Sequence, residues 1–236
     1  MIAKLRKFAV GRMNWYFNLY AGKEKRPVFF DIQETCPQLL VFDKHYNEIM
    51  KDYQYVDQHY KLQTYHDLDK TQYEISATVD ANKKWKIFVL NLMGVTPELA
   101  LKLCPQTSKL LESIPNVYQA FFSILEPGKS VPAHCGPYLG YLRYHLGLKV
   151  PAQNPPSIRI KDQIYVWQDG KSVLFDDTWE HEVYNSAKED RIILIVDIYR
   201  PLPFWPHNVN SFFIKKIIKT LYADKVVKKV KMEKKD

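Results

Sequence analysis

The second half of the chain alternates short apolar runs with turn residues. Pro, Gly, Asp and Asn separate runs that are too short for helices but suit strands. Seven such runs at this spacing are typical of a β-sandwich or an open barrel. We therefore expect a mainly β protein with flanking helices, built on a double-sheet jelly roll of about eight strands. The seven predicted strands are Gln119–Leu125, Tyr141–Val150, Ser157–Ile160, Gln163–Trp167, Ser172–Phe175, His181–Tyr184 and Arg191–Tyr199.

The first half of the chain has mixed patterning. Residues 29–60 contain apolar positions at helical spacing, and Trp85–Leu90 has the composition of a strand. A short helix is predicted with Thr96 as its N-cap and Pro97 in its first turn, and another over Lys109–Ser113. We divide the chain into a basic N-terminal arm (1–26), a jelly-roll domain with N-terminal helices (27–210) and a basic amphipathic C-terminal helix or tail (211–236).

Charge is concentrated at the two ends of the chain. Residues 1–26 and 211–236 each carry a net charge of +6, and the total is +8, which leaves about −4 for residues 27–210. A nucleic-acid-binding protein would more often carry a basic stripe on its folded body, so we predict no nucleic-acid partner. Basic ends suit peripheral contact with an anionic membrane surface. Solvated tails, or a C-terminal helix that packs on the domain, explain the same pattern.

The location of the protein is predicted from its cysteines and apolar runs. The three cysteines form no CxxC pair, which favours a reducing compartment. No run approaches the roughly 18–20 apolar residues that would span a bilayer. We expect a cytoplasmic protein that contacts the inner face of the membrane only peripherally, if at all.

Five residues in the strand-rich half are candidates for chemistry. His134 and His181 both lie beside turns at strand ends, where two imidazoles can converge on one metal ion such as Fe(II). Arg191 begins an apolar strand, and a guanidinium there needs an anion, for which a carboxylate is a good geometric match. Arg143 and His145 alternate with apolar residues and should share one strand face. They would meet either a ligand or an internal salt-bridge partner.

Four sequence blocks in order resemble the aspartyl/asparaginyl β-hydroxylases and the related bacterial lipid A 2-hydroxylases. These enzymes are Fe(II)- and 2-oxoglutarate-dependent oxygenases with a cupin-like jelly roll, the double-stranded β-helix. The resemblance covers roughly the last two-thirds of the folded body, and Cys104-Pro105-Gln106-Thr107 adds a weaker upstream match. The blocks are FFSILEPG (Phe121–Gly128), HCGPYLGYLRYHLGL (His134–Leu148), the segment Trp167–Asn185 and RIILIVDIYRP (Arg191–Pro201).

The resemblance assigns a role to each matched residue. It makes His134 and His181 the catalytic iron ligands, and it places the distal carboxylate of 2-oxoglutarate on Arg191, assisted by Ser123. Arg143 and His145 would contact the co-substrate near its other carboxylate. Typical relatives in the wider superfamily carry a ligand carboxylate two residues after the first histidine, where this chain has Gly136. Its absence is characteristic of the family, and Asp177 is expected either to support the metal through a water or to serve as a turn residue.

The resemblance also implies a reaction. Iron, 2-oxoglutarate and O₂ would together hydroxylate an unactivated C–H bond and release succinate and CO₂. The first candidate substrate is a peptidyl Asp or Asn residue, and the alternative is the 2-position of a lipid acyl chain, as in lipid A. A small-molecule substrate and halogenation are further options. A jelly-roll module that binds a metal or ligand without turnover is the competing reading from another class.

Overall fold

Eight consecutive strands form the centre of the molecule. The computed structural model describes residues 2–68, 83–223 and 233–235. The first and the last of these eight strands belong to the larger of two antiparallel sheets. Between them the chain crosses repeatedly from one sheet to the other. The eight strands are β5 (Val117–Leu125), β6 (Val131–His134), β7 (Tyr141–Lys149), β8 (Ser157–Ile160), β9 (Gln163–Val166), β10 (Ser172–Phe175), β11 (His181–Tyr184) and β12 (Arg191–Tyr199).

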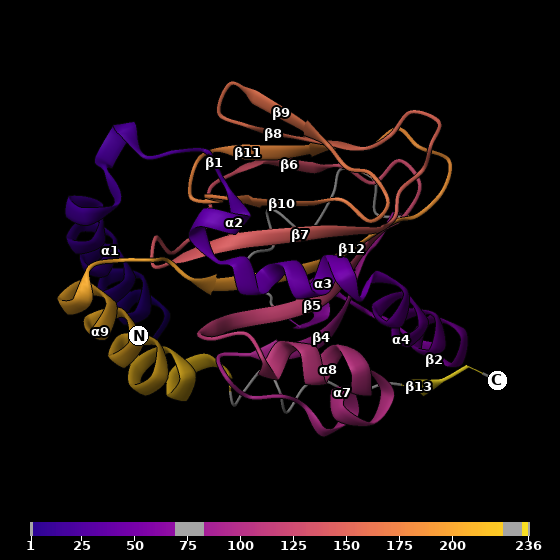
Figure 1. Cartoon of the computed structure of the whole chain (residues 1–236), viewed down its shortest axis with the longest axis horizontal. Helices are drawn as coiled ribbons and strands as arrows, with labels where there is room; N and C mark the ends of the chain where they lie inside the picture. Colours follow the sequence, from indigo (N-terminus) through magenta and orange to yellow (C-terminus); the bar gives the residue numbers. More distant parts are fainter. Residues whose placement is uncertain (1, 69–82, 224–232, 236) are drawn as a thin grey trace.

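The strand order confirms the predicted jelly roll. The larger sheet contains the run β10-β7-β12-β5, and the smaller sheet has the order β6-β11-β8-β9. Figure 1 shows the smaller sheet stacked over the larger one, so each sheet turns one face toward the other. All seven strands predicted in this half are present, and four of them have the predicted bounds. The fold is a double-stranded β-helix with flanking helices.

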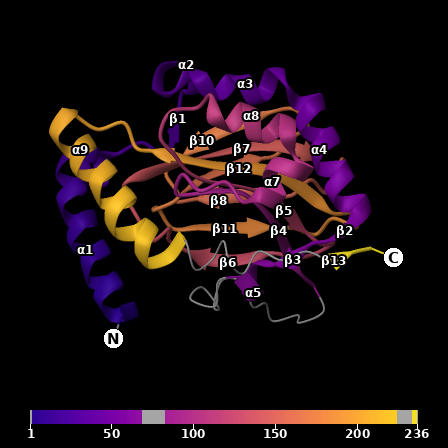
Figure 2. The ribbon, with the colours of Figure 1, turned by 90° about the horizontal axis from the view of Figure 1, so that it is seen from below.

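The larger sheet is extended at both edges by strands from the N-terminal half. β1 (Phe29–Phe30) pairs with β10, β4 (Trp85–Leu92) pairs with β5, and β3 (Gln63–Thr64) pairs with β4. Helices cover the face of this sheet that is turned away from the smaller sheet (Figure 2). They include α2 (Ile32–Thr35), α3 (Leu40–Lys44), α4 (Tyr46–His59), α7 (Glu98–Leu103) and α8 (Pro105–Glu112), and α5 (Tyr65–Leu68) follows β3.

Strand alternation divides the interior into two layers. On β12, Leu194 and Val196 pack in the apolar layer between the larger sheet and its helices. Ile193 and Ile195 lie in the other layer, between the two sheets. Arg191 has the same parity as Ile193, so it also faces the space between the sheets. The candidate site is therefore expected inside the jelly roll and away from the helical layer.

The N-terminal helix and the helices that follow β12 lie at one end of the jelly roll. α1 (Ile2–Ala21) is followed by a 3₁₀ turn at Lys23–Lys25. α9 (Phe204–Phe212) continues into a π-helix, η4 (Phe213–Ala223). Phe17, Phe213 and Ile214 of these helices are buried. β13 (Glu233–Lys234) pairs with β2 (Tyr60–Lys61), whereas residues 224–232 of the predicted tail lie outside the described part. No described helix is both long enough and apolar enough to cross a bilayer.

Two predicted helix starts were wrong. α7 begins at Glu98 with the extended Pro97 as its N-cap, and Asn91 Nδ2 donates instead to the Thr96 hydroxyl at 3.1 Å. α8 begins at Pro105, four residues before the predicted start. Its first turn is held by buried Asp52, whose carboxylate accepts hydrogen bonds from the Thr107 backbone N–H and hydroxyl. This partner from α4 is distant in sequence, so local patterning did not reveal it.

Candidate active site

Strand pairing brings the two predicted metal ligands together. His134 ends β6 and His181 begins β11, and the two residues are register partners with ring centroids 4.1 Å apart. Nδ1 of His134 lies 2.8 Å from the Pro132 carbonyl, and Nδ1 of His181 lies 2.9 Å from the Trp179 carbonyl. Because a carbonyl only accepts, each Nδ1 carries the proton and each Nε2 keeps its lone pair. The geometry offers two Nε2 atoms to one metal ion.

Burial keeps both imidazoles in the neutral form that binds metals. Desolvation, reinforced by neighbouring His134, lowers the pKa of His181 to about 3. Burial also lowers the pKa of His134, and the positive charge of Arg143 acts in the same direction. Among the described residues, no group of three or more His, Cys, Asp or Glu side chains could hold a metal. The described part of the protein thus offers two imidazoles at this position and no third His, Cys, Asp or Glu side chain grouped with them.

The Asp177 carboxylate occupies the space beside Gly136. A Cβ atom at position 136 would lie 2.4 Å from Asp177 Oδ1, and the Gly136 N–H donates to the Asp177 carbonyl at 2.8 Å. Oδ2 accepts from the Tyr141 hydroxyl at 2.9 Å and pairs with Arg143 at 3.0 Å, whereas Oδ1 has no partner. Burial raises the pKa of Asp177 to about 7 against the opposing effect of Arg143. Glycine is required here for space, because its backbone does not adopt a positive φ.

Gly136→Ala should therefore destabilise the protein by about 1–3 kcal/mol, because the added methyl group must displace a buried, hydrogen-bonded carboxylate. Gly136→Asp should be worse, because it places a second carboxyl group against Asp177. Chemical denaturation of the metal-free variants measures both effects. Gly136→Asp combined with Asp177→Gly should recover much of the loss, because the new carboxylate then takes the vacated space. If Gly136→Ala unfolds at the wild-type denaturant concentration, the close approach to Asp177 does not constrain the site.

Arg191 is a buried cation with no counter-charge among the described residues. It begins β12, its side chain is buried, and Nε has no hydrogen-bond partner. Its guanidinium lies 4.8 Å from the centroid of the Trp167 ring. Burial lowers the pKa of Arg191 to about 9, so the group still carries its charge at neutral pH. A desolvated cation of this kind is costly unless an anion pairs with it, and a planar guanidinium suits a carboxylate.

Ser123 and His145 lie on the same inner surface as Arg191. Ser123 pairs with Ile193 on β12, which makes it a diagonal neighbour of Arg191. Its Oγ accepts from Trp85 Nε1 at 2.9 Å, so its own O–H remains to donate. His145 is fully enclosed, and neither ring nitrogen has a partner. Burial, followed by the charges of Arg143 and Arg191, holds the pKa of His145 well below its usual range. Arg191 and Ser123 thus offer hydrogen-bond donors, and His145 a neutral ring, on one inner surface between the sheets.

Arg143 shares a strand face with His145, as predicted, but it is already paired. Its Nε and Nη2 contact the two oxygens of Asp197 at 2.8 Å each, and its Nη1 contacts Asp177 at 3.0 Å. The structure thus contains the internal salt bridge that the sequence left open for this residue. The contact of Arg143 with a co-substrate stays a prediction. Its ion pairs with Asp197 and Asp177 hold the Asp177 carboxylate in place beside Gly136.

Three residues around the site were missed by sequence reasoning. Asp197 anchors Arg143, Tyr141 holds Asp177, and Trp167 lies against Arg191. Asp197 carried a usable signal, because it is a carboxylate in an otherwise apolar strand with the same parity as Arg191. Tyr141 and Trp167 carried none, because buried aromatic residues are common in any core.

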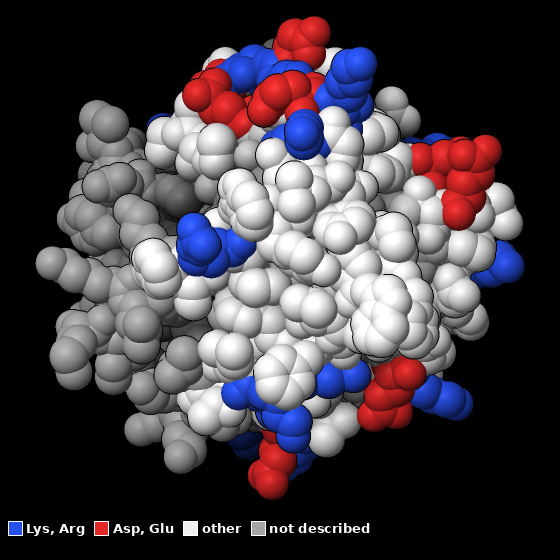
Figure 3. Space-filling model, turned by 90° about the vertical axis from the view of Figure 1, so that its left-hand side faces the viewer, with Lys and Arg blue, Asp and Glu red and all other residues white. Residues whose placement is uncertain are grey.

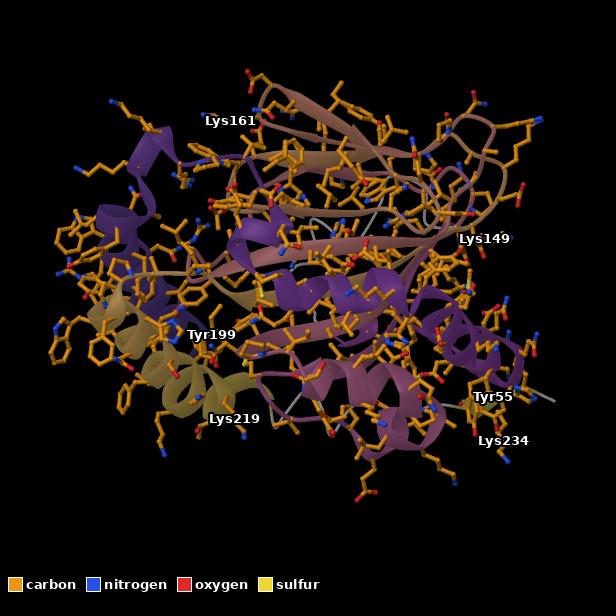
Figure 4. The ribbon with its side chains drawn as sticks, in the orientation of Figure 1. Tyr55, Lys149, Lys161, Tyr199, Lys219 and Lys234 are labelled. Atoms are coloured by element: carbon orange, nitrogen blue, oxygen red, sulfur yellow. The ribbon has the colours of Figure 1, made fainter. Side chains whose placement is uncertain are left out.

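The turn before His181 is held by a cationic clamp. The Trp179 ring lies between the guanidinium of Arg26, 3.6 Å from its centroid, and the Lys161 ammonium, 3.8 Å away. Lys161 is marked in Figure 4 beside the smaller sheet. Buried Asp176 pairs with Arg26 at 3.0 Å and with Arg200 at 2.7 Å. Trp179 thus helps to fix the backbone that orients His181.

Cys135 and the thiols elsewhere do not join the site. Cys135 is exposed, and Cys36 and Cys104 are buried and unpaired. Cys135 follows His134 at the end of β6, where successive side chains point to opposite faces. Tyr138 is buried and its hydroxyl donates to Asn210 Oδ1 at 2.5 Å. It links the loop after Gly136 to α9.

The stability of the metal-free protein should depend on pH through His145. Its pKa in the folded protein is depressed, whereas the unfolded value is about 6.5. Below that pH the unfolded chain binds a proton that the folded site excludes, so stability is lost as pH falls. Replacing His145 with Asn should make the free energy of unfolding fall less steeply between pH 6.5 and 4. Equal slopes for the two metal-free proteins, measured by denaturation with a chelator present, would contradict this assignment.

The chain is similar to a known family of hydroxylases. Residues 43–201 match the family described as aspartyl/asparaginyl beta-hydroxylase. An ornithine lipid ester-linked acyl 2-hydroxylase from Rhizobium tropici is 38% identical over 187 residues, covering 78% of this chain and 65% of that protein. The human aspartyl/asparaginyl beta-hydroxylase is 39% identical over 122 residues, covering 50% of this chain and 16% of that protein.

The family match spans every residue of the site. The His pair, Gly136, Ser123, His145 and Arg191 all fall within residues 43–201. This chain spans less than two thirds of the length of both relatives. The match covers well over half of this chain, from α3 to the residues that follow β12. The chain belongs to the aspartyl/asparaginyl β-hydroxylase family.

Proposed function

We propose that the protein is an Fe(II)- and 2-oxoglutarate-dependent hydroxylase. The observation that carries the proposal is the buried Arg191 guanidinium, which has no carboxylate partner among the described residues and lies between the same two sheets as the Nε2 atoms of His134 and His181. A structural arginine would have a carboxylate partner, as Arg143 has in Asp197. A module that binds metal alone would have no need for a buried cation nearby. The family to which the chain belongs supports the same reading.

Each residue then has a defined task. His134 and His181 would hold Fe(II), which with 2-oxoglutarate and O₂ supplies the oxidation of an unactivated C–H bond. Arg191 would pair bidentately with one carboxylate of 2-oxoglutarate, and the Ser123 hydroxyl would donate to the same group. His145 would offer a neutral ring N–H. Gly136 provides no ligand to the metal, so a water would take that coordination position. Asp177 would hold this water, because its Oδ1 lacks a protein partner.

For the substrate we propose the 2-position of a lipid acyl chain. The Rhizobium tropici lipid hydroxylase matches 78% of this chain, whereas the human β-hydroxylase matches 50%. The likeness to the lipid enzyme therefore extends further along this chain. Peptidyl Asp or Asn is the second candidate, supported by the 39% identity with the human enzyme over the shared segment.

A paired substrate assay tests the function and the substrate together. The iron-loaded protein is incubated with 2-oxoglutarate, O₂ and either an ester-linked acyl lipid in mixed micelles or an Asp- and Asn-containing peptide. We expect succinate in proportion to lipid that has gained one oxygen at carbon 2. Oxygen gain only on the peptide would overturn the acyl assignment. No succinate with either substrate, from protein that binds both Fe(II) and 2-oxoglutarate, would favour a non-catalytic binding module.

A further inference from the structure

The outer sides of α1 and α9 present a continuous apolar surface, which we call the α1–α9 face. The two helices lie side by side at one end of the jelly roll (Figures 1 and 2). Nine of the fourteen exposed large hydrophobic side chains in the described part of the protein belong to α1, α9 and η4. These are Phe8, Trp15, Leu19, Tyr20, Phe204, Trp205, Val209, Phe212 and Ile217. Such a concentration marks an interaction surface, because scattered exposure would need no explanation.

The exposed side chains cannot turn inward, because the opposite sides of these helices are already packed. On α1, Phe8, Trp15 and Leu19 recur at helical spacing on the outer side, whereas Phe17 is buried on the inner side. On α9, Trp205 and Phe212 are 75% and 62% exposed, whereas Asn210 and Phe213 are buried. The ring contacts of this face within the described chain stay on a single helix: Tyr20 meets Tyr16, Arg12 lies over Trp15, and Phe204 meets Trp205.

The charged residues of α1, α9 and η4 are all basic. Residues 8–26 contain a single acid, Glu24, which follows α1, and residues 204–223 contain none. Arg12, Lys23 and Lys25 are exposed near α1, and Lys215 and Lys216 are exposed on η4. Figure 3 shows a broad uncharged centre, with basic and acidic side chains around its edge. In Figure 4, the labelled Lys219 also lies on this end of the molecule, on η4.

This chemistry fits an anionic lipid surface better than a protein partner. Protein interfaces are depleted in lysine relative to the rest of the surface, whereas helices that lie in a membrane interface combine Lys and Arg with Trp, Phe and Leu. Tryptophan favours the headgroup region, where its ring is partly apolar and its N–H stays hydrated. Basic residues at the edge would approach the phosphates of anionic lipids.

We propose that the α1–α9 face docks on the surface of an anionic phospholipid bilayer, with the Trp15, Trp205 and Phe212 side chains inserted at the headgroup level. This inference goes beyond the proposed reaction, since docking is measured without turnover. Docking through this face would also set the orientation of the candidate active site relative to the bilayer. Asn14 of α1 contacts the Pro137 carbonyl and the Leu139 N–H, both at 2.9 Å, and Tyr138 is bonded to Asn210 of α9. The docked face is thus attached to the loop that follows His134 and Gly136.

Vesicle sedimentation tests the docking. The full chain should bind vesicles of equal parts phosphatidylglycerol and phosphatidylcholine, more weakly at high salt, and bind pure phosphatidylcholine much less. Trp15→Ser with Trp205→Ser should weaken binding to the mixed vesicles at least about tenfold, because two inserted rings are lost. The matched control is Ile164→Ser with Tyr184→Ser, which removes two hydrophobic residues that are 66% and 49% exposed on the smaller sheet. It should bind as the wild type does.

Tryptophan emission gives a second readout on the same vesicles. Trp15 and Trp205 are 64% and 75% exposed, whereas Trp167 and Trp179 are buried. Brominated lipids should quench the wild type but not a Trp15→Phe, Trp205→Phe variant that still binds. Equal vesicle binding by the serine variant and the wild type would overturn the proposal. So would a wild-type dimer that these serine substitutions dissociate and that does not bind vesicles, because a second copy would then cover the face.

Discussion

Replacing His134 or His181 with alanine should lower Fe(II)-dependent succinate formation by at least about 100-fold, because removal of residues that merely support a metal ligand already costs 10- to 100-fold. Each loss leaves the metal with one imidazole, since the described site provides two His ligands and no third side chain. The measurements are Fe(II) affinity by anaerobic titration and succinate release from the same preparation. Both should fall in both variants.

The matched control for the histidine variants is His45→Ala. His45 lies at the start of α4, far from the His pair in sequence, and is about half exposed. Its replacement should leave both metal affinity and turnover unchanged. Far-UV circular dichroism should be retained in all three variants, because His134 and His181 lie at strand ends. Near-normal succinate production by either site variant would remove the iron assignment.

Arg191→Leu should separate ligand binding from folding. Loss of one side of a buried charge pair costs on the order of 2–5 kcal/mol, which corresponds to a roughly 30- to 5,000-fold weaker affinity for 2-oxoglutarate. The same substitution should stabilise the protein in the absence of ligand, because it removes a buried cation that has no counter-charge. Calorimetric titration and thermal unfolding of the ligand-free protein provide the two measurements.

Arg191→Lys is the conservative partner of this variant. A lysine restores the positive charge but not the planar fork, so it should rescue 2-oxoglutarate affinity only in part. A structural arginine would behave in the opposite way. In that case Arg191→Leu would lower the unfolding temperature while leaving 2-oxoglutarate affinity at the wild-type value, and the co-substrate assignment would fail.

The strands of the jelly roll were predictable because short apolar runs are separated by turn residues, which marked most strand ends. β12 is apolar along most of its length because both of its faces are buried, with Ile193 in one apolar layer and Leu194 in the other. β6 was missed because its four residues, Val-Pro-Ala-His, include a proline and have little apolar patterning. Its identity as a strand depends on pairing with β11, which is distant in sequence.

The site was predictable in its residues but not in its network. His134, His181 and Arg191 were singled out by their places beside turns or at the start of an apolar strand, together with the family resemblance. Each of them does lie at the end or the start of a strand. The partners of Arg143 did not, since Asp177 and Asp197 come from two other segments that folding brings together. Only part of the role of Gly136 could be predicted from the sequence. Its lack of a ligand side chain was clear from the sequence, whereas its contact with Asp177 depends on tertiary packing.

The central claim is that one metal ion and one 2-oxoglutarate share the space between the two sheets. Anaerobic calorimetry of 2-oxoglutarate binding, with and without Fe(II), tests it most directly. We predict one 2-oxoglutarate per chain in the presence of Fe(II), much weaker binding without metal, and the same weak binding in His181→Ala with Fe(II) present. Equal 2-oxoglutarate affinity with and without Fe(II), unchanged in His181→Ala, would show that the anion site at Arg191 and the histidine pair are independent.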